Sequence, residues 1–433
     1  MKKVAFHTLG CKVNQYETQA MGEIFEKSRY QVVPDSEVAD VYVINTCTVT
    51  NVGDKKSRQF IRRAKKMNPG GIVVVVGCYA QTAPQEVMDI EGVNLVMGTN
   101  DRHLIVDYVE KASPDEKINA VDDIMQVQKF EALSVQEIKG KTRAFLKIQE
   151  GCNRYCSYCI IPYARGPIRS RDHQEVIDEV VRLVENGFQE VVLTGIHVAS
   201  YGRDINQKNA LIQLLKAVND VAGLKRLRLS SLEPTLLSEA FLKELVKLEK
   251  VCPHFHLSLQ SGCDRMLKAM NRTYTTGMYR SIVQRIRNYY PAIALTTDII
   301  VGFPGETEAD FEETMAFVEE MAFSELHIFK FSPRKGTPAA DFPDQVDGIT
   351  KHKRSEGLIA LGNGLKVRYQ RAFLDQRMDV LLETMSREVP GHLEGLTDNY
   401  LKVLVPGEEA LEGTFQSVVL ESLQGDSILG KIK

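Results

Sequence analysis

Long apolar runs are absent from this sequence of 433 residues. The longest, from Ile72 to Val76, matches a single buried strand, whereas a membrane-spanning helix needs about 18 or more apolar residues. The first residues, Met1 to His7, lack the apolar stretch of a signal peptide and lead directly into a predicted strand. We therefore expect a cytoplasmic protein with no membrane partner.

An excess of positive charge is also missing, because 54 Lys and Arg stand against 57 Asp and Glu. The net charge of −3 excludes a general polycation. Any binding of nucleic acid must therefore depend on local basic patches. Repeats and low-complexity tracts are absent as well, and the length indicates roughly two to four domains.

Disulfides are not expected in a reducing compartment, although the chain has eight cysteines. Metal or redox chemistry is the better explanation for them. Two of the eight, Cys252 and Cys263, have no partners at related positions, and we interpret them as structural.

The first hundred residues alternate strands and helices, which is typical of a parallel sheet covered on both faces, as in a flavodoxin-like domain. The predicted strands are Lys3–Thr8, Val41–Asn45, Ile72–Val76 and Asn94–Met97, and the main helices are Tyr16–Lys27 and Gly53–Met67. The less regular residues that follow predict a helix end and then a connecting strand or linker.

From about residue 143 the alternation resumes, with six predicted strands that suit a full or partial α/β barrel. They are Phe145–Gln149, Glu190–Leu193, Arg226–Ser230, His254–Leu259, Leu295–Val301 and Glu325–Phe331. Residues 351–371 form a basic helix. Four short apolar runs follow, Met378–Glu383, Tyr400–Val405, Gly413–Leu423 and Ser427–Ile432, as in a small β-barrel. We predict domains at 1–125, 143–368 and 369–433, with a linker at 126–142.

Cys152, Cys156 and Cys159 form a C-x₃-C-x₂-C motif on one short loop. Three thiolates can bind three irons of a [4Fe–4S] cube, which leaves the fourth iron open to S-adenosylmethionine. A zinc site is the alternative, but zinc usually requires four protein ligands, and the remaining cysteines offer no second knuckle. The motif therefore favours an iron–sulfur cluster that generates a radical from S-adenosylmethionine.

This motif, with Tyr158 just before its last cysteine and a predicted strand before its first, resembles the radical-SAM superfamily. The resemblance implies a partial (β/α)₆ barrel whose cofactor lies at the carboxyl ends of the strands. The residues that it implies for binding S-adenosylmethionine are Tyr158, Gly195, His197, Glu233, Gln260, Ser261 and Gly302. Each of the short segments after the strands that contain these residues could, taken alone, equally be a tight turn.

A second set of cysteines, Cys11, Cys47 and Cys78, follows three predicted parallel strands. The carboxyl ends of parallel strands converge on one edge of a sheet, so these thiols could meet there as ligands of another cluster. Buried structural cysteines are the alternative, since free cysteines are often buried. Three at equivalent positions favour the cluster.

Both cysteine sets together resemble the methylthiotransferase family over nearly the whole chain. The resemblance implies an N-terminal domain with the auxiliary cluster, a radical-SAM domain and a C-terminal TRAM barrel. It also implies two [4Fe–4S] clusters and two molecules of S-adenosylmethionine. By this resemblance, one molecule methylates sulfur attached to the auxiliary cluster that Cys11, Cys47 and Cys78 hold. The other, at Cys152, Cys156 and Cys159, yields the 5′-deoxyadenosyl radical that removes hydrogen from the substrate carbon.

The segment Thr8-Leu9-Gly10-Cys11-Lys12-Val13-Asn14 is most similar to the branch that acts on threonylcarbamoyladenosine in tRNA. Where this chain has Lys12-Val13, the isopentenyladenosine branch tends to have Gln-Met, and the branch that modifies a ribosomal-protein aspartate tends to have Pro-Lys. The segment Ile160 to Gly166 is also closer to the first branch.

The predicted helix Gly53–Met67 supports an RNA substrate. Its side chains Lys55, Arg58, Arg62 and Lys65 share one predicted face and could contact phosphates. A solvated helix face is the ordinary alternative. The predicted TRAM barrel has eleven acids and only six Lys and Arg, which suits a basic protein substrate better than RNA. Methylthiolation of isopentenyladenosine or of a ribosomal protein therefore stays open.

Two other classes also remain, a non-enzymatic iron–sulfur electron carrier and an RNA-binding sensor of oxygen or iron. The segments at the strand ends have no purpose in an electron carrier. For the enzyme we expect tRNA as the substrate, a reductase or flavodoxin as the electron donor, and a monomer.

Overall fold

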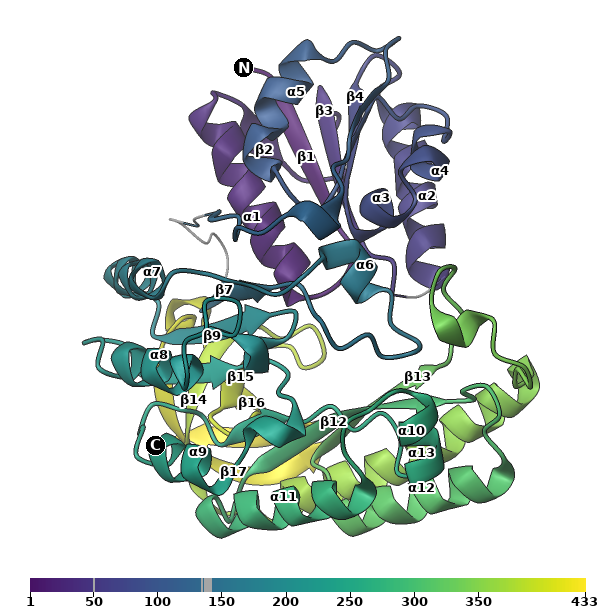
Figure 1. The fold of residues 1–433 in the computed structure, drawn as a ribbon. Helices are drawn as coiled ribbons and strands as arrows, with labels where there is room; N and C mark the ends of the chain where they lie inside the picture. Colours follow the sequence, from purple (N-terminus) through teal and green to yellow (C-terminus); the bar gives the residue numbers. More distant parts are fainter. Residues whose placement is uncertain (50, 134, 136–141) are drawn as a thin grey trace.

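The computed structural model describes residues 1–49, 51–133, 135 and 142–433. The chain folds into an N-terminal sheet domain, a central open barrel and a small C-terminal barrel (Figure 1). In the described part of the chain, no helix has the length and apolar character to cross a membrane.

The N-terminal domain has a six-stranded parallel sheet with the order β2-β1-β3-β4-β5-β6. Its strands are β1 (Lys3–Thr8), β2 (Gln31–Val33), β3 (Val41–Thr46), β4 (Ile72–Gly77), β5 (Leu95–Met97) and β6 (Ile118–Ala120). The order reverses between β1 and β3, as in flavodoxin-like folds, where ligands bind at this switch point. The predicted class of the domain is confirmed.

Helices cover both faces of this sheet (Figure 1). α1 (Lys12–Lys27) and α5 (Ile105–Lys111) pack on one face, and α2 (Asn51–Met67), α3 (Cys78–Thr82) and α4 (Pro84–Met88) pack on the other. Because neither face meets water, β4 is buried from Val73 to Gly77. This explains why the longest apolar run of the sequence is a central strand.

The central domain is a partial barrel of six parallel strands in chain order, as predicted. The strands are β7 (Arg143–Glu150), β9 (Glu190–Gly195), β10 (Arg226–Leu229), β11 (His254–His256), β12 (Ala294–Val301) and β13 (Glu325–Lys330). Two sheets, β10-β9-β7 and β11-β12-β13, are joined by single bridges such as Leu232–Leu257. The short antiparallel strand β8 (Arg169–Ser170), which we did not predict, pairs with β7.

Helices pack on the outer face of this barrel around a large apolar core. They are α7 (His173–Glu185), α8 (Ala210–Asn219), α9 (Glu239–Leu245), α11 (Thr276–Tyr289), α12 (Glu308–Met321) and α13 (Gly348–Arg371). Two short helices, α6 (Ile161–Arg165) and α10 (Asp264–Ala269), lie near the cysteine motif. α1 of the N-terminal domain contacts β7 and β9, so the two domains form a shared interface.

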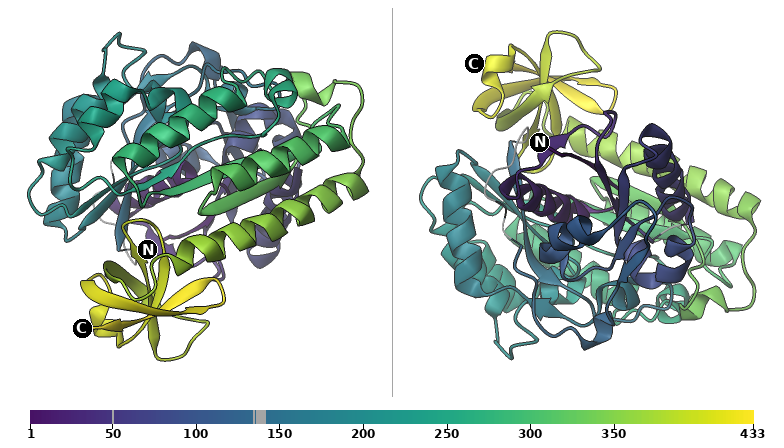
Figure 2. Two further views of the ribbon diagram at one scale, coloured as in Figure 1. Left: turned by 90° about the horizontal axis from the view of Figure 1, so that it is seen from below. Right: turned by 90° about the horizontal axis from the view of Figure 1, so that it is seen from above.

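The C-terminal domain is a closed barrel with the order β14-β15-β16-β18-β17, to one side of the other domains (Figure 2). Its strands are β14 (Arg377–Met385), β15 (His392–Thr397), β16 (Lys402–Pro406), β17 (Phe415–Gln424) and β18 (Ser427–Ile432). We did not predict β15, because Gly395 interrupts its apolar pattern. A Cβ at Gly395 would lie 2.5 Å from the carbonyl oxygen of Leu381, so glycine allows β14 and β15 to approach closely.

The predicted linker 126–142 lies only partly in the described chain, since residues 134 and 136–141 are outside it. Its first residues are partly exposed, but its end is packed into the molecule. Leu133 and Val135 are buried in the core of the central domain, and the carbonyl oxygen of Leu133 accepts a hydrogen bond from Tyr16 of α1.

Candidate active site

The three cysteines of the N-terminal domain, Cys11, Cys47 and Cys78, lie at the carboxyl ends of β1, β3 and β4. Cys11 precedes α1, Cys47 follows β3, and Cys78 is the first residue of α3. Gly10 has a φ of +117°, and a Cβ there would lie 3.0 Å from the Cβ of Cys47. The loops that carry Cys11 and Cys47 are therefore in contact, as the topology predicted.

Asn14 connects these loops from the first turn of α1. Its Nδ2 donates hydrogen bonds of 2.9 Å to the carbonyl oxygens of both Leu9 and Thr46. The side chain is almost fully buried. Asn14 thus fixes the spacing between the Cys11 and Cys47 loops.

Burial raises the pKa of the Cys78 thiol to about 12, and the neighbouring thiols of Cys47 and Cys11 raise the pKa further. Burial also raises the pKa of Cys47. Such thiols become thiolates only when a metal or cation stabilises the charged form.

The three cysteines of the central domain, Cys152, Cys156 and Cys159, lie in the loop after β7. Gly151 begins the loop with a φ of +72°, and a Cβ there would lie 1.8 Å from the carbonyl oxygen of Pro167. Only glycine fits this position. Burial raises the pKa of Cys159 to about 12, and Cys156 adds to the effect.

In the described residues, no three His, Cys, Asp or Glu side chains lie close enough to hold a single metal ion. A structural zinc site requires four ligands around one atom. A [4Fe–4S] cube instead offers a separate iron to each thiolate, so its ligands can lie farther apart. Each set supplies three thiols, of which only that of Cys11 belongs to an exposed residue, and three thiolates fit a cube with one open iron.

Each set also has one arginine on a cysteine sulfur. Arg272 donates from Nη1 to Sγ of Cys156 at 3.2 Å, and Arg165 donates from Nε to Sγ of Cys78 at 3.2 Å. Hydrogen bonds and positive charge at the sulfurs stabilise thiolates and tune cluster potentials. Neither arginine was predicted from the sequence, because Arg272 is 116 residues from Cys156 in the chain and Arg165 is 87 residues from Cys78.

Glu233 and His197, two residues predicted to bind the cofactor, meet beside Arg272. Nε2 of His197 lies 3.2 Å from the Glu233 carboxylate, and Nη2 of Arg272 lies 3.4 Å from it. Burial would raise the pKa of Glu233, but His197, Arg272 and Arg154 outweigh it and lower the pKa to about 2. The carboxylate is therefore a fixed negative charge next to Arg272, the residue that donates to the Cys156 sulfur.

A cavity of about 250 Å³ opens next to this group. Its lining comes from both domains and consists of Val49, Tyr158, Cys159, Ile160, Ile161, Gln260, Asp298, Ile300, Phe329, Lys330, Phe331 and Ser332. Two of the predicted cofactor residues, Tyr158 and Gln260, are among them. Gln260 has a φ of +75°, a strained conformation that often marks a functional position.

The other predicted cofactor residues lie differently. Gly195 packs against Gln149, whose Oε1 accepts a hydrogen bond from the backbone of His197. Ser261 is buried, and its hydroxyl lies 3.2 Å from that of Thr314, away from the cavity lining. Gly302 has a φ of +68° and packs against Lys351. Ser261 and Gly302 support the loops rather than line the cavity.

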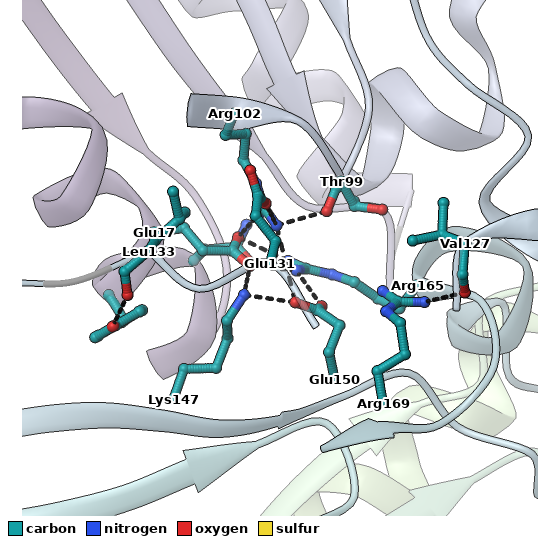
Figure 3. Close-up of polar contacts among 12 residues, drawn as sticks. Glu17, Thr99, Arg102, Val127, Glu131, Leu133, Lys147, Glu150, Arg165 and Arg169 are labelled. Atoms are coloured by element: carbon teal, nitrogen blue, oxygen red, sulfur yellow. Dashed lines mark hydrogen bonds and ion pairs between the residues drawn. The ribbon is translucent and has the colours of Figure 1, made fainter. Parts of the chain in front are cut away.

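The strongest feature that sequence reasoning missed is a buried cluster of charges between the two domains (Figure 3). Its ion pairs connect Glu17, Arg102, Glu131, Lys147, Glu150 and Arg165. Arg169 lies beside them and donates to the carbonyl oxygen of Val127 at 3.5 Å. Nη1 of Arg165 contacts Glu17 and lies 2.7 Å from Glu150, and its Nη2 donates to Asn14 at 2.8 Å. Arg165 thereby contacts the auxiliary cysteine set, α1 and β7. Charged residues inside the apolar strand β7 were the available signal.

The basic residues of α2 do not form one free stripe. Lys55 and Arg62 are exposed, whereas Arg58 donates to Tyr79 at 3.0 Å and pairs with Glu86 at 3.3 Å. Lys65 is half-buried and packs over Gly92. Of the four predicted residues, Lys55 and Arg62 are thus open to solvent, whereas Arg58 and Lys65 make contacts within the domain.

Comparison with known proteins identifies the family. Residues 3–98 match the uncharacterized protein family UPF0004, and residues 146–318 match the radical SAM superfamily. The chain is 45% identical to the threonylcarbamoyladenosine tRNA methylthiotransferase of Bacillus subtilis, over 96% of this chain and 93% of the relative. The chain belongs to the radical-SAM methylthiotransferase family. Its predicted membership of this family is confirmed.

More distant methylthiotransferases match as well. The tRNA-2-methylthio-N(6)-dimethylallyladenosine synthase of Moorella thermoacetica is 35% identical over 96% of this chain and 95% of the relative. Among solved structures, the radical S-adenosylmethionine methyltransferase TsrM from Kitasatospora setae has a TM-score of 0.58. The match covers 78% of this chain and 77% of the TsrM chain, and at 16% identity it supports the fold alone.

Proposed function

We propose that this methylthiotransferase inserts a methylthio group at C2 of N6-threonylcarbamoyladenosine, next to the anticodon of tRNA. Three relatives at 45%, 41% and 35% identity have the name threonylcarbamoyladenosine tRNA methylthiotransferase. The observation that carries the proposal is the pairing of two cysteine sets through Arg165, which contacts Cys78 and belongs to the helix directly after Cys159.

In this proposal Cys152, Cys156 and Cys159 hold one [4Fe–4S] cluster, and Cys11, Cys47 and Cys78 hold the other. When bound, the first cluster supplies the electron that cleaves S-adenosylmethionine, and the second holds the sulfur to be transferred. Glu233 and Arg272 provide charges for the amino acid part of S-adenosylmethionine, and His197 orients the Glu233 carboxylate. Tyr158 and Gln260 line the cavity in which cofactor and substrate base would meet.

A direct comparison of substrates tests the proposed activity. The reconstituted enzyme is incubated anaerobically with reductant, S-adenosylmethionine and one of three substrates, and the products are weighed. The substrates are tRNA with threonylcarbamoyladenosine, tRNA with isopentenyladenosine, and the small-subunit ribosomal protein. We expect a methylthio gain on the first. A gain on the ribosomal protein alone, with both tRNAs unchanged, would overturn the proposal.

The number of clusters is tested by iron and sulfide content. Two [4Fe–4S] clusters contain about eight irons, and substitution of Cys11, Cys47 and Cys78 by Ala should leave about four. An unchanged iron content in that variant would refute the auxiliary cluster. We also propose an external reductase or flavodoxin as the electron donor and a monomeric enzyme, which sedimentation analysis can verify.

A further inference from the structure

Three large aromatic side chains are exposed in the described chain, and all of them lie at the candidate active site. Tyr155 is 40% exposed, Tyr163 is 41% exposed and Phe329 is 46% exposed. Tyr155 belongs to the cysteine loop, Tyr163 to α6, and Phe329 to β13 at the cavity. Exposed aromatic rings gathered at a reaction site indicate a partner that covers them.

Tyr155 and Tyr163 form a pair. Their ring centroids are 5.9 Å apart at an interplanar angle of 72°, so one ring edge meets the face of the other. Tyr155 has a φ of +48°, which is unfavourable for a tyrosine. Nδ2 of Asn271 donates to its carbonyl oxygen at 3.0 Å and helps to hold this conformation. The pair is therefore presented to solvent in a fixed arrangement.

The surrounding elements support the cysteine loop from two more sides. The backbone of Ser157 donates to Met270 at 3.1 Å and accepts from Ala339 at 2.8 Å. Exposed lysines lie on both supporting segments, Lys268 in α10 and Lys335 in the loop before Ala339. Lysines beside exposed aromatics suit RNA, which offers phosphates and stacking bases together.

The tyrosine pair is adjacent to the cavity but does not line it. Cys159 and Ile161 line the cavity, whereas Tyr155 and Tyr163 belong to the same loop and helix and are not among the lining residues. Enzymes that act on a base take it out of the stack into a pocket. The target adenine would then enter the cavity beside Phe329, and its neighbouring nucleotides would remain outside.

We propose that Tyr155 and Tyr163 form a stacking platform for the unpaired nucleotides that flank the modified adenosine. This inference rests on the proposed tRNA substrate. Unpaired loop bases characteristically stack on exposed aromatic side chains in RNA complexes.

The platform is tested with Tyr155→Ala/Tyr163→Ala and the matched variant Tyr155→Phe/Tyr163→Phe, which keeps both rings. Affinity is measured by fluorescence anisotropy with an anticodon stem-loop that contains threonylcarbamoyladenosine. We expect the alanine variant to bind at least about tenfold more weakly, because each base–aromatic stack contributes about 1–3 kcal/mol. The phenylalanine variant should bind like the wild type. Met278→Ala, at an exposed position of α11, serves as the surface control.

Iron content and thermal unfolding show whether the alanine variant is folded. If it is folded and binds the stem-loop like the wild type, the platform is refuted. Slower reduction by flavodoxin with unchanged RNA affinity would refute it too, and would assign the pair to the donor. The proposed function is assessed separately, by product formation with the wild-type enzyme. It can therefore fail or hold independently of the platform.

Discussion

The guanidinium of Arg165 lies 3.2 Å from the sulfur of Cys78, although the two residues belong to different domains. α6, which ends at Arg165, begins two residues after Cys159. A single short helix thus connects the loop that would bind S-adenosylmethionine with the loop that would hold the transferred sulfur. In this account the relative position of the two cysteine sets depends on Arg165 and the charges around it.

Arg165→Lys keeps a positive charge but loses the fork that contacts Cys78, Asn14 and Glu150 together. We expect methylthiolation to fall by about 10- to 100-fold, as for other partners of metal ligands. The reduction potential of the auxiliary cluster should become more negative, since a hydrogen bond to sulfur is lost. Redox titration followed by electron paramagnetic resonance, in a variant with Cys152, Cys156 and Cys159 changed to Ala, measures this shift. An unchanged potential would contradict the role of Arg165.

Glu17→Gln removes a carboxylate that contacts three buried cations, Arg102, Lys147 and Arg165. Removal of one partner from a buried ion pair costs about 3–5 kcal/mol, because the remaining charges lose their compensation. Denaturant unfolding measures the loss. Glu86→Gln is the control, since its pair with Arg58 is exposed and should contribute only about 0–1 kcal/mol. Equal losses in both variants would show that the buried cluster does not stabilise the interface.

The same cluster predicts acid sensitivity. Burial would raise the pKa of Glu17, but Arg102, Arg165 and Lys147 lower it from 4.5 to about 2. A lowered folded-state pKa means that this stabilisation is complete above pH 4.5 and declines as the pH falls toward 2. Hydrogen exchange at α1 and β7, corrected for the intrinsic exchange rate, should stay constant between pH 7 and pH 4.5 and show progressive opening of the interface below pH 4.5. In Glu17→Gln the dependence should be weaker, and an equally steep profile would contradict the assignment.

Lys55→Glu with Arg62→Glu reverses two exposed charges on α2. We expect tRNA to bind about tenfold more weakly or worse, with a smaller dependence of affinity on salt, because phosphate contacts are lost. Lys243→Glu in α9 with Lys247→Glu in the turn just after it reverses two exposed charges and serves as the control. An equal loss in the control would point to net charge rather than to the α2 surface.

The sequence was informative where ligands are local or follow from topology. Cys152, Cys156 and Cys159 lie on one loop, and Cys11, Cys47 and Cys78 lie where parallel strands end, so both sets could be predicted. The partners of Arg165 and Arg272 could not, because they come from distant segments that meet only after the domains pack. Ser261 shows the opposite limit. It follows a strand end as predicted, but its hydroxyl is directed toward Thr314.

The proposed activity requires that one chain both activates C2 of threonylcarbamoyladenosine and delivers sulfur to it. The most direct measurement is a single turnover with tRNA deuterated at C2 of that nucleoside, followed by mass spectrometry of both products. We predict that the deuterium appears in 5′-deoxyadenosine and that the nucleoside gains a methylthio group. Formation of 5′-deoxyadenosine without deuterium, with the nucleoside unchanged, would contradict the account.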